Sequence, residues 1–80
     1  SDALVDKGLK FTGNNTGTEN AHKLGSLVKV QGEGLTATDV PTFASAAGNI
    51  AVVANGTDTL ELKLNKNLKG INSVTNGNIE

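Results

Sequence analysis

The chain has 80 residues, a formal net charge of −1, two Phe, and no Trp, Tyr, Met or Cys. A domain of this size buries only roughly 60–65% of the surface that its unfolded chain exposes, and small folds normally need disulfides, a metal or a partner subunit as well. The absence of Cys and the single His argue against the first two, and the lack of clustered Lys or Arg argues against nucleic acid as a partner.

The first part of the chain predicts a linker, a strand and a turn. Ser1–Lys7 is polar and is interpreted as a linker. Gly8–Thr12 alternates, with Leu9 and Phe11 on one face of an extended backbone, which predicts a first strand. Gly13–Gly17 collects residues that tolerate positive φ or bond to their own backbone, so the chain is expected to turn there.

The middle of the chain predicts one further strand between two segments without a clear pattern. Thr18–Lys23 is polar and receives no assignment. Ser26–Gln31 predicts a second strand, in which Val28 and Val30 point to the same side. From Leu35 to Gly48 we expect an irregular connection, because the stretch that suits a helix is too short to stand without strong packing.

Asn55 and Gly56 lie between two strand patterns, Asn49–Ala54 and Thr57–Leu64. An Asn-Gly pair in this position is the strongest short-range signal for a hairpin, because both central residues of a type I′ turn need a positive φ. We therefore predict an antiparallel hairpin that turns at Asn55 and Gly56.

The second strand of this hairpin carries a stripe of leucines. Leu60, Leu62 and Leu64 alternate with Glu61 and Lys63, so an extended backbone places three leucines on one face and two charges on the other. The stripe is interpreted as a core or subunit interface rather than as a ligand groove.

Beyond the leucines, the chain is expected to bend and then to become extended again. Asn65 and Asn67 are poor helix residues, and Gly70 costs about 1 kcal/mol relative to Ala inside a helix. We therefore predict a strand that bends or bulges at Asn65–Asn67 and resumes near Ile71. Ser73–Thr75 and Asn78–Glu80 flank a second Asn-Gly pair, which predicts either another hairpin or a strand that is cut short. Short strands joined by Gly/Asn turns predict an all-β fold with antiparallel pairing.

No arrangement of residues in the sequence predicts catalysis, a cofactor or a metal site. His22 has no Ser, Cys or carboxylate at the spacing of a catalytic triad and is interpreted as a surface or packing histidine. Gly32–Gly34 lacks the third glycine of a phosphate-binding loop. The longest apolar run, Ile50–Ala54, is far shorter than the ~20 residues that cross a bilayer, so no membrane contact by this fragment is expected.

Several short motifs in a fixed order resemble the head modules of trimeric autotransporter adhesins. The motifs are Gly8–Asn14, His22–Gly25, Val28–Gly32, Asn49–Gly56, Leu60–Leu64 and Asn67–Thr75. Within the last of them, Gly70-Ile71-Asn72 resembles the signature of the GIN domain of that family. The similarity runs over most of the chain, and the absence of Trp sets the chain apart from the Trp-ring module that often neighbours this domain.

The resemblance implies a homotrimeric all-β prism to whose walls each chain supplies strands, with one domain over residues 8–80. It also implies a non-catalytic structural and adhesive role at the surface of a Gram-negative bacterium, in a fibre held by a C-terminal outer-membrane anchor that lies outside this fragment. The expected partners are two further copies of the chain and host cell-surface or extracellular-matrix proteins. The residues expected at the trimer core or interface are Val28, Val30, Val52, Leu60, Leu62, Leu64 and Ile71.

Two alternatives belong to other functional classes. The first is a monomeric β-domain that binds a protein or carbohydrate ligand, although the near absence of aromatic rings argues against a sugar. The second is a hydrolase, which needs a nucleophile and a base in a cleft. His22 alone offers little toward that chemistry.

Overall fold

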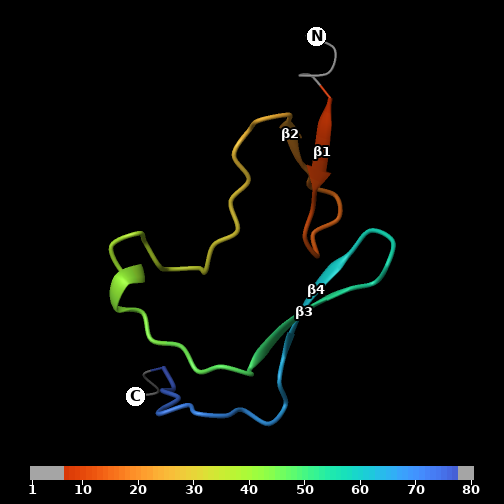
Figure 1. Cartoon of the computed structure of the whole chain (residues 1–80). Helices are drawn as coiled ribbons and strands as arrows, with labels where there is room; N and C mark the ends of the chain where they lie inside the picture. The colour runs from red at the N-terminus through yellow and green to blue at the C-terminus, as the bar shows by residue number, and fades with distance from the viewer. Residues whose placement is uncertain (1–6, 78–80) are drawn as a thin grey trace. The chain divides into compact units, whose positions relative to one another are not determined.

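The computed structural model describes residues 7–77 and contains two small antiparallel sheets of two strands each (Figure 1). The chain divides into two units, one ending at Thr36 and the other beginning at Ala37, and each unit contains one of the sheets. Within residues 7–77 there is no α-helix, only a short 3-10 turn at Val40–Thr42 (η1). The all-β class predicted from the sequence is therefore confirmed.

The first unit is a hairpin of β1 (Gly8–Phe11) and β2 (Asn20–Lys23). Leu9 lies opposite His22 and Phe11 lies opposite Asn20, so the predicted common face of Leu9 and Phe11 is confirmed. Strand β2 falls in the polar segment that received no assignment. Its residues carry no alternating pattern, and they become a strand because the preceding loop returns them to the edge of β1.

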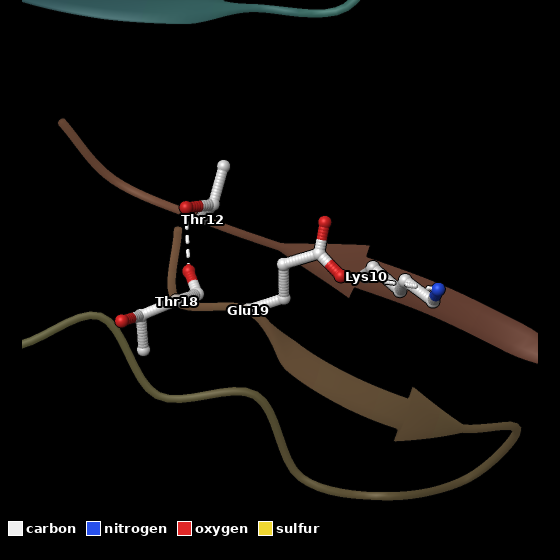
Figure 2. A network of polar contacts seen from close by, with 4 residues as sticks. All are labelled: Lys10, Thr12, Thr18 and Glu19. Atoms are coloured by element: carbon white, nitrogen blue, oxygen red, sulfur yellow. Dashed lines mark hydrogen bonds and ion pairs between the residues drawn. The ribbon is translucent and has the colours of Figure 1, made fainter. Parts of the chain in front are cut away.

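Hydrogen bonds within the loop bring the chain back from β1 to β2. The Thr12 hydroxyl donates to the Thr18 carbonyl over 2.7 Å, and the Thr18 N–H donates to the Asn15 carbonyl over 2.9 Å. Figure 2 shows the Thr12–Thr18 bond beside Lys10 and Glu19, whose side-chain charges are 3.8 Å apart on exposed surface. The turn predicted at Gly13–Gly17 is confirmed.

The strand predicted at Ser26–Gln31 is wrong for the single chain. The Ser26 N–H donates to the Lys23 carbonyl over 3.0 Å, which forms a turn at the end of β2 and takes the chain away from the ladder. Among the described residues, none bonds to the backbone of Leu27–Gln31. An alternating pattern specifies which side chains share a face, but a strand also needs a neighbour for its backbone groups.

The second unit contains the hairpin of β3 (Ile50–Ala54) and β4 (Leu60–Leu64). The strands pair antiparallel, with Val52 opposite Leu62, so the predicted hairpin is confirmed. The predicted irregular connection before it is also confirmed, with η1 as its one regular turn.

The predicted type I′ turn of that hairpin is wrong. The loop runs from Asn55 to Thr59, Gly56 has φ +85°, and no residue other than glycine has a positive φ in the described part of the chain. The Asn55 side-chain oxygen accepts the backbone N–H groups of Thr57, Asp58 and Thr59 at 2.8, 3.0 and 3.1 Å. A longer loop is favoured because one side chain then satisfies three backbone donors.

After β4 the chain bends as predicted but does not return to a strand. The Asn65 N–H donates to the Asn49 carbonyl over 2.7 Å, and the Asn65 side-chain oxygen accepts the Asn67 N–H over 2.9 Å, which turns the chain. The strand expected to resume near Ile71 and the strand leg at Ser73–Thr75 are wrong, because residues 71–77 form no strand and pair with none of the described residues. The other leg, at Asn78–Glu80, and most of the linker at Ser1–Lys7 lie outside the described residues.

Neither unit has an apolar core of its own among the described residues. No hydrophobic side chain in residues 7–77 is buried, and the one buried residue there is polar, Asn49, at 7% exposure. Burial of apolar surface is the main favourable term in folding. The apolar residues of this chain therefore need a cover that the described contacts within each unit do not supply.

Candidate assembly interface

One face of the β3–β4 hairpin is entirely apolar. The register places Ile50 opposite Leu64, Val52 opposite Leu62 and Ala54 opposite Leu60. Residues directly opposite one another in an antiparallel pair lie on the same side of the sheet. The members of this apolar face are Ile50, Val52, Ala54, Leu60, Leu62 and Leu64.

The other face of the same hairpin is mixed. Ala51 lies opposite Lys63 and Val53 lies opposite Glu61. The Lys63 ammonium is 4.0 Å from the Glu61 carboxylate, and both side chains are exposed. An exposed ion pair of this kind adds little stability, but it marks this face as the one that tolerates water.

Every large side chain of the apolar face is more exposed than Val53, the large apolar side chain of the mixed face. Leu62 is 71% exposed and Val52 is 59% exposed, whereas Val53 on the mixed face is 44% exposed. Full burial of a Val, Leu or Ile side chain contributes about 1.5–3 kcal/mol, so covering the large side chains of the apolar face is worth on the order of 10 kcal/mol. That is as large as the net stability of a typical domain.

The structure brings four of the predicted interface residues together, namely Val52, Leu60, Leu62 and Leu64. Ile50 and Ala54 share this face and were not predicted as interface residues, although the alternation within Ile50–Ala54 contained the signal. Ile71 lies in the second unit after the bend and is exposed, outside any strand. Val28 and Val30 belong to the first unit, where Val30 is 90% exposed.

Val28 and Val30 border an open groove in the first unit. The groove has a volume of about 690 Å³, and its lining comes from the β1–β2 hairpin and from the segment Leu27–Val30. Phe11 and His22 lie within this lining as an edge-to-face pair, with ring centres 5.4 Å apart and planes at 82°.

His22 also contacts a serine that the sequence analysis did not connect with it. His22 Nδ1 is 2.9 Å from the Ser26 hydroxyl oxygen, and that hydroxyl donates to the Lys23 carbonyl over 2.8 Å. Because a serine hydroxyl has one proton, Nδ1 is the donor in its contact with Ser26. The two contacts together join the His22 ring to the turn after β2.

The β3–β4 loop is closed by Asn55 and Asp58. Asn55 Nδ2 donates to the Asp58 carboxylate over 3.1 Å, and the Thr59 hydroxyl donates to the same oxygen over 2.8 Å. These bonds, the one from Asn55 foremost, hold the pKa of Asp58 below its usual value. The predicted turn residues Asn55 and Gly56 thus lie in the loop, with Asn55 as its main hydrogen-bonding group.

Asn49 joins two segments that are distant in the sequence. Its Nδ2 donates to the carbonyls of Ala46 and Lys69 over 3.1 and 2.9 Å, and its Oδ1 accepts the Lys69 N–H over 2.8 Å. The Asn65 Nδ2 adds a bond to the Gly48 carbonyl over 3.1 Å. Asn49 was predicted only as the first residue of a strand, because its role depends on a segment that is distant in the sequence.

Within residues 7–77, no group of three or more His, Asp or Glu side chains is placed to hold a metal ion. In the same range, no helix has the length and apolar content needed to cross a membrane.

Comparison of the chain with protein-family models, curated proteins and solved structures gives no match.

Proposed function

We propose that this chain is a non-catalytic structural and adhesive head module of a trimeric autotransporter adhesin, displayed at the surface of a Gram-negative bacterium. It works as a homotrimer that contributes to attachment to host cell-surface or extracellular-matrix proteins. The proposal combines the sequence resemblance to GIN-like heads with one structural observation. That observation is the uncovered apolar face of the β3–β4 hairpin.

The apolar face supports assembly because an isolated two-stranded hairpin is at best marginally stable in water. Three copies around a threefold axis turn the same face of each hairpin toward the axis, so that each copy covers the other two. The charged pair of Glu61 and Lys63 then faces outward. This arrangement gives the chain the core that its described residues lack.

The segment Ser26–Gln31 provides a second, weaker support. It has the alternation of a strand, and the backbone of Leu27–Gln31 is unpaired among the described residues. Backbone donors and acceptors next to exposed apolar side chains are a ready site for pairing with another chain. A neighbouring copy that supplied the missing strand would explain why this sequence pattern is present.

The first experiment is the mass of the purified chain by light scattering, repeated on dilution. The proposal expects a mass of three chains that persists to low concentration. A stable, folded monomer would overturn it and favour a monomeric β-domain that binds a protein or carbohydrate ligand.

A matched pair of variants makes the test specific to the apolar face. Val52→Asp and Val53→Asp place the same charge on neighbouring residues of β3 that belong to opposite faces. In the single chain Val53 is the less exposed of the two, so a monomer would suffer more from Val53→Asp. The trimer predicts the reverse, because Val52→Asp puts a carboxylate into the shared core.

Adhesion is tested separately, on the trimer. Immobilised extracellular-matrix proteins should retain the wild-type trimer, and the dissociated Val52→Asp chain should lose this binding because a trimer presents three copies of any contact surface. A trimer that binds none of the matrix proteins or host cells tested would leave assembly standing and remove adhesion from the proposal.

A further inference from the structure

The chain contains two Asn-Gly pairs, Asn55-Gly56 and Asn76-Gly77, whose surroundings differ sharply. In such a pair the backbone nitrogen of the glycine attacks Cγ of the asparagine side chain. The N–Cγ bond forms, the Cγ–Nδ2 bond breaks, the glycine amide proton leaves to solvent, and the side-chain nitrogen departs as ammonia after taking up a proton. Water then opens the resulting succinimide ring to aspartate or isoaspartate.

This reaction requires the glycine nitrogen to approach Cγ in a suitable direction. A group held in another geometry reacts slowly, because productive orientation accounts for much of the rate of any intramolecular attack. Glycine has no side chain to hinder the approach, and it allows the backbone to reach unusual conformations. The reactivity of the two pairs is therefore decided by how firmly each asparagine side chain is held.

The Asn55 side chain is held at both of its polar atoms. Its Oδ1 accepts three backbone N–H groups of the loop, from Thr57, Asp58 and Thr59. Its Nδ2, the atom that would leave, donates to the Asp58 carboxylate over 3.1 Å. Rotating Cγ toward the Gly56 nitrogen would break these bonds, and the loss of Nδ2 would remove the bond to Asp58.

The Asn76 side chain has none of these restraints. It makes no hydrogen bond with any residue of the described part of the chain, and it lies in an exposed stretch without regular secondary structure. Gly77 is equally open, since a Cβ placed on it would meet no atom within 4 Å. The side chain and the backbone at this pair are free to sample the reactive geometry.

We propose that Asn76 is a site of spontaneous deamidation and isomerisation, and that the loop hydrogen bonds protect Asn55 from the same reaction. Conversion of Asn76 replaces a neutral side chain with a carboxylate and makes the net charge of −1 more negative by one. The isoaspartate product also routes the backbone through the former side chain. The modification therefore alters both charge and chain path near the end of the described residues.

The test follows both sites within one sample of the full chain. The protein is incubated at neutral to mildly alkaline pH, digested, and analysed by mass spectrometry for the mass increase of deamidation at each asparagine. Isoaspartate is detected by enzymatic methylation. In the folded chain, Asn76 is expected to convert at least about tenfold faster than Asn55. Equal rates, or faster conversion of Asn55, would overturn the proposal.

The same chain unfolded in urea is the matched control. Both pairs then lack tertiary restraint, so the two rates should come within a few-fold of each other, with Asn55 accelerated more than Asn76. If the rate ratio were unchanged by urea, local sequence would be its cause and the assigned protection would be wrong. The comparison is internal to one chain, so it stands independently of the proposed trimer.

Discussion

The side chain of Asn49 pairs with the backbone of Lys69 as a neighbouring strand would. Its Oδ1 accepts the Lys69 N–H over 2.8 Å and its Nδ2 donates to the Lys69 carbonyl over 2.9 Å. One amide side chain thus reproduces both bonds of a peptide group and fixes the segment after the bend to the start of β3. These bonds also explain how the one buried residue of the described chain can be polar, because both polar atoms of its side chain have hydrogen-bond partners.

We expect Asn49→Asp to destabilise the protein. The carboxylate cannot donate to the Ala46 and Lys69 carbonyls, and the loss of buried hydrogen bonds costs about 1–3 kcal/mol. Urea unfolding of the purified protein measures the change. Asn72→Asp is the matched control, since Asn72 is exposed, and equal unfolding midpoints for the two variants would contradict the role of Asn49.

We expect Leu62→Asp to dissociate the proposed trimer and to unfold the hairpin. Leu62 occupies the middle of β4 on the apolar face, opposite Val52, and an unpaired buried charge costs several kcal/mol. Light scattering and circular dichroism measure the two effects. Lys63→Asp places a carboxylate on the next residue and the other face, so it should leave the mass unchanged. A stable trimer of Leu62→Asp would place the leucine stripe outside the core.

Gly56→Ala is expected to cost about 1–2 kcal/mol. Gly56 has φ +85° in the β3–β4 loop, a region that residues with a side chain enter only with strain. Thermal unfolding measures the cost. Gly17→Ala is the control, because Gly17 lies in an open loop without a positive φ and should be close to neutral. Similar effects of the two substitutions would mean that the loop does not need this conformation.

Acid should loosen the β3–β4 loop through Asp58. The pKa of Asp58 is below its usual value of 3.8 in the folded chain, because the Asn55 amide and the Thr59 hydroxyl donate to its carboxylate. The folded state therefore binds this proton less readily than the unfolded state. The contribution of Asp58 to stability is present above about pH 4 and is lost as the pH falls through the lower folded value.

Nuclear magnetic resonance measures this titration at the Asp58 carboxyl carbon. In Asn55→Ala the pKa of Asp58 should rise toward its usual value, since the larger of the two hydrogen-bond effects is removed. Thr59→Val should produce a smaller rise. An unchanged Asp58 titration in Asn55→Ala would show that the hydrogen bond does not hold the carboxylate in solution.

Alternation along the chain was sufficient to predict the faces of the strands that found partners. Leu9 and Phe11 share a face of β1, and the leucines of β4 share a face with Val52, because a period of two is a property of any extended backbone. The same pattern in Ser26–Gln31 led to a wrong prediction, since alternation does not report whether a neighbouring strand is present.

For the turns, too, the sequence predicted the position but not the detailed structure. The Asn-Gly pair located the β3–β4 hairpin, but the loop that formed is longer, because the Asn55 side chain bonds to Thr57, Asp58 and Thr59. The Asn-Gly pair indicates where the chain reverses its direction. The donors that its side chain reaches depend on the residues that follow.

By itself, the sequence determined an all-β chain, the antiparallel hairpin of β3 and β4, and the stripe of leucines on β4. Only the tertiary structure decided that Ile50 and Ala54 join that stripe, that His22 meets Ser26, and that Asn49 holds Lys69. The physical reason is the range of the interactions. Face and turn propensity are set by neighbours along the chain, whereas strand register and side-chain pairing with a distant backbone depend on where the chain folds back.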